Sequence, residues 1–245
     1  ASLTHLRHPN LVPVLDFGIE GHTAYLVMSY IPGGHLRQRH PKGTRVPLST
    51  IVTYVKQLAQ ALSYIHQHNL VHRDVKPHNM LIGPAGEIML SDFGIAIVSP
   101  SIIPGSYDFE GTVLYAAPEQ LMGHPRRSSD QYALGIVVYE WLSGTWPFYG
   151  TFDEIVEQHL SAPPPPLRER GIVVPATVEE IVLRTLAKKP EDRFMRIEDF
   201  SLALEHASKT TWQQPDSSDL LAPGRRQFMS PLPFHTSEHR LQGGS

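Results

Sequence analysis

The sequence predicts an α+β fold, in which a short β-rich part is followed by a larger and mainly helical part. Residues 12–18 and 24–31 are short segments rich in β-branched and aromatic side chains, with turn residues between them, so we expect a β-hairpin. Beyond residue 118, apolar side chains recur at helical spacing and predict helices over 130–143, 152–160, 177–187 and 196–207. The chain has 245 residues, enough for one large domain with a substantial core.

Three further elements complete the expected fold. Residues 1–6 look like the last turns of a helix. Apolar side chains at helical spacing predict a longer helix over 49–68, for which Ser49 is a suitable N-cap. Short strands are expected around 79–82 and 88–90, because a turn of Gly, Pro and Ala separates two apolar segments there.

Composition excludes several classes of protein. The formal net charge of −3 lacks the basic field that nucleic-acid binding requires, so we expect no nucleic-acid partner. The absence of cysteine excludes disulfides and agrees with a cytoplasmic location. The longest apolar run, 132–142, is about half of a membrane span, so we expect no membrane segment in this chain. Residues 208–245 lose the apolar periodicity and predict a disordered tail.

The residues that carry chemistry begin at 72–79, which read HRDVKPHN. Asp74, Lys76 and Asn79 share one loop after a helix, so their side chains can converge. An Asp-Phe-Gly tripeptide starting at Asp92 follows thirteen residues beyond Asn79, directly after a predicted strand. Phosphoryl transfer needs a carboxylate near the attacking hydroxyl, a cation near the γ-phosphate, and metal ligands from an amide and a second carboxylate. Together, at this spacing, the two motifs predict such a site.

These motifs resemble those of the eukaryotic-like protein kinase family, particularly its bacterial Ser/Thr kinases. The resemblance covers roughly residues 1–207, and the motifs occur in the right order. Further matches are Gly111-Thr112, the YAAPEQ segment over 115–120, the DQYALG segment that starts with Asp130, and Arg193, which the family pairs with the glutamate at Glu119.

The resemblance implies a two-lobe kinase fold with a truncated N-terminal lobe. Residues 1–31 would be the remnant of the β-rich N-lobe, 32–207 a complete and mainly α-helical C-lobe, and 208–245 the tail. It also implies a protein Ser/Thr kinase of the kind used in bacterial signalling, with ATP and Mg²⁺ as cofactors and proteins as substrates.

Roles for individual residues follow from the resemblance. Asp74 would orient the substrate hydroxyl and accept its proton, and Lys76 would neutralise charge on the γ-phosphate. Asn79 and Asp92 would hold Mg²⁺, which prefers oxygen ligands. Thr112, together with Lys76, is typical of Ser/Thr rather than Tyr kinases and would hydrogen-bond near the catalytic aspartate and lysine.

The resemblance places the adenine of ATP against residues 25–31. Met28 would be the gatekeeper, main-chain groups of Ser29 and Ile31 would bind the base, and Leu81 would lie under the ring. Most relatives have Glu where this chain has Ser29, a substitution that we expect to be tolerated because the family's contact there is through the backbone.

Arg73, next to the catalytic aspartate, implies control by phosphorylation of the loop between the Asp-Phe-Gly motif and Thr112. Ser106 is the first-choice acceptor, and autophosphorylation there would involve self-association. In the alternative, Asp108 and Glu110 already supply the negative charge. A phosphate carries about twice the charge of a carboxylate and favours the first interpretation.

The family also requires a glycine-rich loop, a strand lysine and a glutamate that pairs with that lysine. None of the six lysines is placed to grip the α- and β-phosphates; they are Lys42, Lys56, Lys76, Lys188, Lys189 and Lys209. We therefore expect a fragment of an enzyme that is inactive alone. A pseudokinase scaffold and a truncated regulatory or binding fragment stay open as alternatives, although the intact catalytic motifs argue against the first.

Two other features have simpler interpretations. A second Asp-Phe-Gly, starting at Asp16, has no HRD-like segment before it and is expected to end a hairpin strand. The fourteen histidines do not converge in the predicted fold, so we expect no structural zinc site. His72 is expected to support the backbone of its loop.

Overall fold

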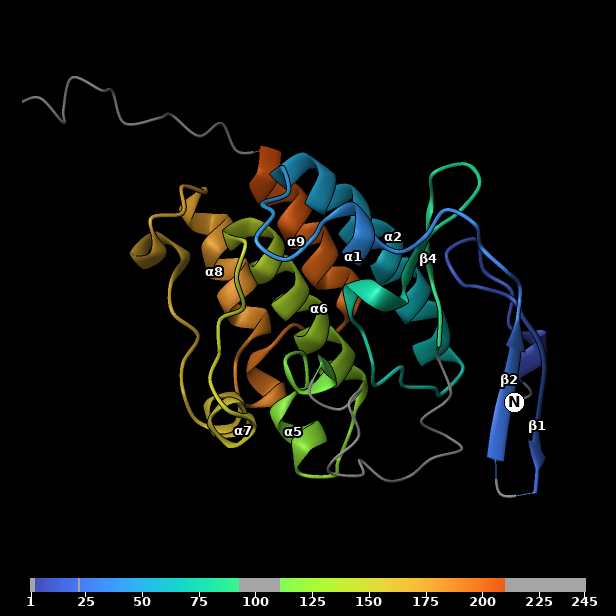
Figure 1. Cartoon of the computed structure of the whole chain (residues 1–245). Helices are drawn as coiled ribbons and strands as arrows, with labels where there is room; N and C mark the ends of the chain where they lie inside the picture. The colour runs from blue at the N-terminus through green and yellow to red at the C-terminus, as the bar shows by residue number, and fades with distance from the viewer. Residues whose placement is uncertain (1–2, 22, 93–110, 210–245) are drawn as a thin grey trace, which may run out of the picture. The chain divides into compact units, whose positions relative to one another are not determined.

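The computed structural model describes residues 3–21, 23–92 and 111–209 (Figure 1). A hairpin is followed by the helices α1 and α2, then by a short second sheet, and then by the remaining helices, which confirms the predicted α+β class. The elements are η1 (Leu3–His5), β1 (Val14–Glu20), β2 (Thr23–Met28), α1 (Leu36–Arg39), α2 (Leu48–Gln67), η2 (Pro77–Asn79), β3 (Met80–Ile82), β4 (Ile88–Leu90), α5 (Pro118–Leu121), α6 (Arg127–Ser143), α7 (Phe152–Leu160), η3 (Leu167–Arg170), α8 (Ala176–Thr185), η4 (Pro190–Asp192) and α9 (Ile197–Lys209).

The predicted hairpin is present as the antiparallel pair β1–β2. Phe17 lies opposite Leu26, and Gly21 takes the left-handed conformation at the turn, with φ of 63°. The Asp-Phe-Gly tripeptide that starts at Asp16 lies inside β1, which continues to Glu20. It therefore belongs to a strand, as expected, but does not end it.

A second antiparallel sheet, β3–β4, is joined to the segment that precedes β1. The amide of Val12 donates to the Leu90 carbonyl at 3.0 Å, and the Leu90 amide donates to the Asn10 carbonyl at 2.8 Å. The buried side chain of Asn10 donates to the Ile88 carbonyl at 2.8 Å and to Gln57 of α2 at 3.1 Å. The hairpin segment is thereby fixed to the strand that leads to Asp92.

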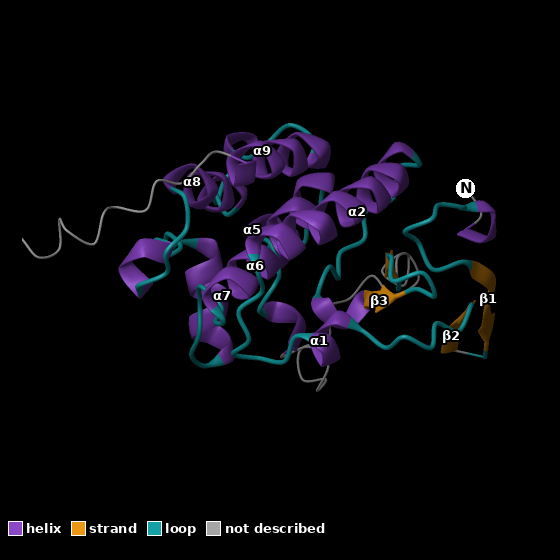
Figure 2. Cartoon of the chain, turned by 90° about the horizontal axis from the view of Figure 1, so that it is seen from above, coloured by secondary structure: helices purple, strands orange, loops and turns teal. Residues whose placement is uncertain are grey.

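The helix α6 lies at the centre of the helical part (Figure 2). Its residues from Ser129 to Ser143 are all buried, as its apolar sequence predicts for a helix covered on every side. It packs against α2 and α8, and α9 packs along α2. Gly135 allows close contact with α8, because a Cβ atom there would collide with the hydroxyl of Thr185.

Two details of the helices differ from the sequence prediction. Helix α2 begins at Leu48 after Pro47, and Ser49 lies inside the helix, so its prediction as N-cap is wrong. Proline already fixes a φ compatible with the helix start, and no side chain caps this end. The four-residue helices α1 and α5 were not predicted, since they are too short to show a helical period. In the described part of the chain no helix could span a membrane.

Helix α7 carries a buried histidine, His159, whose neutral form the fold favours. His159 of α7 is 0% exposed, and its Nδ1 lies 2.9 Å from the Tyr132 hydroxyl. Burial, together with the nearby cation of Lys188, lowers the pKa of His159 to about 3. In the unfolded chain the pKa returns to its ordinary value of about 6.5.

We therefore predict that His159 makes the fold sensitive to acid. Its contribution to stability is complete above the unfolded pKa, and it falls by about 1.4 kcal/mol per pH unit between about 6.5 and 3, because only the unfolded chain takes up the proton. The free energy of unfolding of wild type should drop about 2 kcal/mol more from pH 7 to pH 5 than that of His159→Gln. Equal losses in denaturant titrations would contradict this.

Candidate active site

A buried carboxylate at the start of α6 holds the HRD segment in place. Asp130 is 1% exposed; its Oδ2 accepts from the His72 amide at 2.9 Å and lies 2.7 Å from His66 Nε2 of α2. Its Oδ1 accepts from the Arg73 amide at 2.9 Å. Arg73 has a φ of 69°, a left-handed conformation that is costly for a residue with a side chain. The hydrogen bonds that the His72 and Arg73 amides donate to Asp130 offset that cost.

His72 joins this loop to the strand before Asp92. The Asp74 amide donates to His72 Nδ1 at 3.2 Å, so this nitrogen is the acceptor and Nε2 carries the proton. The Nε2 group donates to the Ser91 carbonyl at 2.9 Å. The Ser91 amide in turn donates to the Asn79 carbonyl at 2.9 Å. His72 thus supports the backbone on both sides of the site.

The three side chains that share the loop after α2 converge on Asp74, and Thr112 joins them, as the family resemblance implies. Lys76 Nζ lies 2.9 Å from Asp74 Oδ2, and Asn79 Nδ2 donates to the same oxygen at 2.8 Å. Lys76 Nζ also donates to the Thr112 hydroxyl at 3.0 Å, and that hydroxyl donates to Asp74 Oδ1 at 3.3 Å. The Asp74 side chain is 32% exposed, so its carboxylate is fixed from the protein side yet reachable by a hydroxyl group from solvent.

Two oxygen donors border this cluster. Asn79 uses its Nδ2 group for hydrogen bonds to the side chain and carbonyl of Asp74, at 2.8 Å each, which leaves Oδ1 for a metal ion. Asp92 lies two residues after the end of β4, has a φ of 61°, and accepts from the Ser91 hydroxyl at 2.9 Å. An amide oxygen and a carboxylate are ligands that suit Mg²⁺.

The predicted pair of Glu119 and Arg193 anchors the other side of the loop. Arg193 Nη1 and Nη2 donate to the two Glu119 oxygens at 2.7 and 2.9 Å, and both side chains are buried. Burial would raise the pKa of Glu119, but the Arg193 hydrogen bonds hold it below its ordinary value. Next to Glu119, Gln120 donates to the Arg73 carbonyl at 2.7 Å. Helix α5 is therefore attached both to the core and to the catalytic loop.

Comparison with known proteins decides the family. Residues 1–216 match the protein kinase domain. The chain belongs to the protein kinase family. The chain is similar to serine/threonine-protein kinase PrkC of Bacillus subtilis (strain 168), with 37% identity over 209 residues. These residues are 84% of this chain and 32% of PrkC.

Two mycobacterial proteins are similarly related to this chain. Serine/threonine-protein kinase PknF of Mycobacterium tuberculosis (strain H37Rv) is 39% identical over 215 residues, 82% of this chain and 44% of PknF. Serine/threonine-protein kinase PknA of the same strain is 37% identical over 228 residues, 90% of this chain and 52% of PknA. The chain spans about a third to a half of the length of these relatives. The predicted resemblance to bacterial Ser/Thr kinases is thus confirmed.

The adenine site stays a prediction, and the backbone of residues 28–31 is compatible with it. Met28 ends β2, and the Ser29 amide donates to the Pro13 carbonyl at 2.9 Å. Among the described residues, the Ser29 carbonyl and the Ile31 amide make no hydrogen bond, so both are available to a base. Leu81 lies on β3, whose neighbour Ile82 donates to the Gly34 carbonyl at 3.0 Å.

Sequence reasoning missed a buried polar cluster formed by Arg37, Tyr115 and Glu140. Arg37 of α1 donates to the two oxygens of Glu140 of α6 at 2.7 and 2.8 Å and to the Tyr115 hydroxyl at 2.6 Å. That hydroxyl donates to Glu140 at 2.8 Å and accepts from Trp146 Nε1 at 3.1 Å. Arg37 and Glu140 are 103 positions apart, and no local signal indicates their contact.

The predicted regulatory residue Ser106 lies outside the described residues.

Proposed function

We propose that the protein is a serine/threonine kinase that transfers the γ-phosphate of ATP to hydroxyl groups of protein substrates. The observation that supports this most is the hydrogen-bonded cluster of Asp74, Lys76, Asn79 and Thr112. In this proposal Asp74 orients the acceptor hydroxyl and takes its proton. Lys76, 2.9 Å from Asp74, neutralises charge on the transferred phosphate.

Mg²⁺ would be held by Asn79 Oδ1 and Asp92, where it would neutralise phosphate charge and orient ATP. The chain's own residues position the reacting groups. Asn79 and Thr112 each contact the Asp74 carboxylate, so its two oxygens keep one orientation as a substrate approaches. Positioning of this kind accounts for a large part of the rate enhancement in phosphoryl transfer.

The site of action would be the cytoplasm, where ATP is the phosphate donor and the absence of cysteine matches the reducing conditions. The partner would be a protein rather than a nucleic acid, for which the net charge of −3 is unsuited.

The first test removes the proposed base. In the full-length gene product, Asp74→Asn should lower kcat for peptide phosphorylation by at least about a thousandfold, since the amide cannot accept the proton. Binding of the nucleotide should change little, because Asp74 is assigned no metal. The matched control is Asp199→Asn in the first turn of α9, a partly buried aspartate whose partner is Arg196. Phosphorylation by Asp74→Asn near the wild-type rate would rule out this role.

The 245-residue chain by itself should bind ATP weakly. Its lysines are engaged elsewhere: Lys42 lies over the Trp146 ring, Lys56 faces Glu205, and Lys188 donates to the carbonyl of Gln158. None is positioned along β2, where a nucleotide would bind. Calorimetry with ATP and Mg²⁺ should give a dissociation constant of about a millimolar or weaker. Micromolar affinity would contradict the expectation.

The alternatives differ in what they predict from the gene. A glycine-rich loop and a strand lysine encoded upstream of Ala1 would support the enzyme. A start codon at or near Ala1 would favour a regulatory or binding protein. A pseudokinase is the weaker alternative, because Asp74, Lys76 and Asn79 are all present and in contact.

We also propose regulation by phosphorylation at Ser106. Arg73 would be the cation that binds the phosphate, since a phosphate accepts paired arginine bonds. In the full-length protein, Ser106→Ala should lower activity at least about tenfold. Asp108→Ala and Glu110→Ala should have smaller effects. If Ser106→Ala keeps full activity and mass spectrometry finds no phosphate over 95–110, the proposal is wrong.

A further inference from the structure

A short turn joins the catalytic cluster to the core of the helical part. Of the residues over 111–117, which read GTVLYAA, only Thr112 and Tyr115 have polar side chains. The Tyr115 amide donates to the Thr112 carbonyl at 3.1 Å, so the backbone between these two residues forms one closed turn. The Thr112 hydroxyl accepts from Lys76 at 3.0 Å and donates to Asp74 at 3.3 Å. A shift of Tyr115 would therefore move the hydroxyl that contacts the catalytic carboxylate.

The side chain of Tyr115 is fixed at the other end of this turn. It is buried, and its hydroxyl donates to Glu140 Oε2 at 2.8 Å and accepts from Arg37 Nη2 at 2.6 Å and from Trp146 Nε1 at 3.1 Å. Burial, followed by the charge of Glu140, raises the pKa of Tyr115, so the hydroxyl keeps the proton that it donates. A hydroxyl has one donor and two acceptor sites, and all three are used here.

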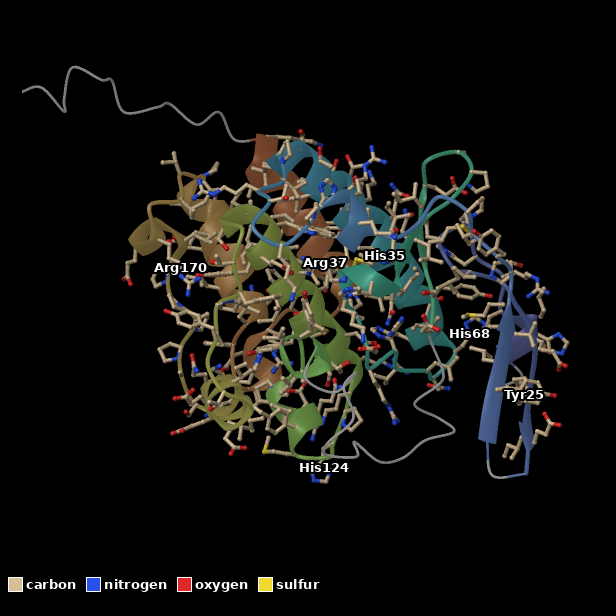
Figure 3. The ribbon with its side chains drawn as sticks, viewed as in Figure 1. Tyr25, His35, Arg37, His68, His124 and Arg170 are labelled. Carbon is tan, nitrogen blue, oxygen red and sulfur yellow. The ribbon has the colours of Figure 1, made fainter. Side chains whose placement is uncertain are left out.

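The partners of this hydroxyl are themselves held in one orientation. Two guanidinium nitrogens of Arg37 donate to the two oxygens of Glu140 at 2.7 and 2.8 Å, and such a paired contact fixes direction as well as distance. Glu140 lies on the buried helix α6, and Arg37 points from α1 into the helical part (Figure 3). Tyr115 therefore takes its position from α1 and α6 and not from the catalytic loop.

The contact at the other end of the turn is sensitive to small shifts. Hydrogen bonds between two oxygen atoms usually measure about 2.5–3.0 Å, so the 3.3 Å between the Thr112 hydroxyl and Asp74 is already long. A displacement of a few tenths of an ångström would break it. The anchors formed by Glu119 and Gln120 lie in α5, beyond the turn. Tyr115 is thus the anchor that lies within the turn itself.

We propose that Tyr115 is a positioning residue for phosphoryl transfer: held by Arg37 and Glu140, it keeps the Thr112 hydroxyl against the Asp74 carboxylate. This inference rests on the proposed kinase function. The Tyr115 hydroxyl has no bonding capacity left for a substrate, so it acts on the reaction through Thr112. Misplacement of a group at this distance from the chemistry lowers the rate of transfer without weakening the binding of the nucleotide.

The first experiment removes the hydroxyl and keeps the ring. In the full-length gene product, Tyr115→Phe should lower kcat for peptide phosphorylation about tenfold or more and change the KM for ATP less than about twofold. The matched control is Tyr139→Phe, which removes the hydroxyl of another buried tyrosine, on α6, that donates to the Pro165 carbonyl at 2.8 Å. It should lower the thermal stability to a similar extent and leave kcat unchanged. Equal losses of kcat in the two variants, or a wild-type kcat in Tyr115→Phe, overturn the proposal.

A double-mutant cycle tests the route through Thr112. Thr112→Ala should lower kcat at least as much as Tyr115→Phe. The double variant should match Thr112→Ala within about twofold, because Tyr115 has nothing left to position once the threonine hydroxyl is gone. Losses that multiply in the double variant would show that Tyr115 acts by another route, and they overturn the proposal.

Hydrogen exchange separates this inference from the kinase function, since it needs no catalysis. In the 245-residue chain, the amide of residue 115 should lose protection about tenfold or more in Tyr115→Phe and keep it in Tyr139→Phe. This loss, combined with no phosphorylation by the wild-type gene product, overturns the kinase function alone. Unchanged protection with an active wild type overturns the positioning role and leaves the kinase function standing. Unchanged protection with an inactive wild type overturns both.

Discussion

The candidate site depends on one buried carboxylate, that of Asp130. It accepts hydrogen bonds from the backbone amides of His72 and Arg73 and contacts the His66 ring, so its two oxygens have three partners inside the protein. Arg73 has a strained backbone conformation, with φ of 69°, that the rest of the loop requires. Asp130 lies in the first turn of α6, the helix that is buried on all sides. The position of Asp74 therefore derives from a helix that is buried from Ser129 to Ser143.

The remaining supports come from other elements and converge on the same loop. His72 joins it to Ser91 before Asp92, and Gln120 of α5 binds the Arg73 carbonyl. Helix α5 is in turn fixed to the core by the buried Glu119–Arg193 pair. Reactive side chains thus lie on loops while their supports lie on helices, an arrangement that combines access with precise geometry.

Much of this structure could be predicted because its signals are local. Helical periodicity predicted α7 over its exact residues, and motif spacing predicted that Asp74, Lys76 and Asn79 converge. The place of Thr112 beside them came from the family resemblance. The rest depends on contacts between distant segments. Glu140 and Arg37 are 103 positions apart, and Asp130 and His66 are 64 positions apart. Spacing in the sequence cannot predict either contact. The N-cap of α2 was mispredicted because Pro47 precedes a serine that looked like a better cap.

Amide hydrogen exchange of His72 and Arg73 tests most directly whether Asp130 holds the catalytic loop. Asp130→Asn keeps the shape of the side chain but replaces one acceptor oxygen with a donor. In the 245-residue variant, protection of at least one of these amides should fall by about tenfold or more. The amides of α9, and both loop amides in the control Asp199→Asn, should keep their wild-type protection. Unchanged protection of His72 and Arg73 in Asp130→Asn would contradict the account.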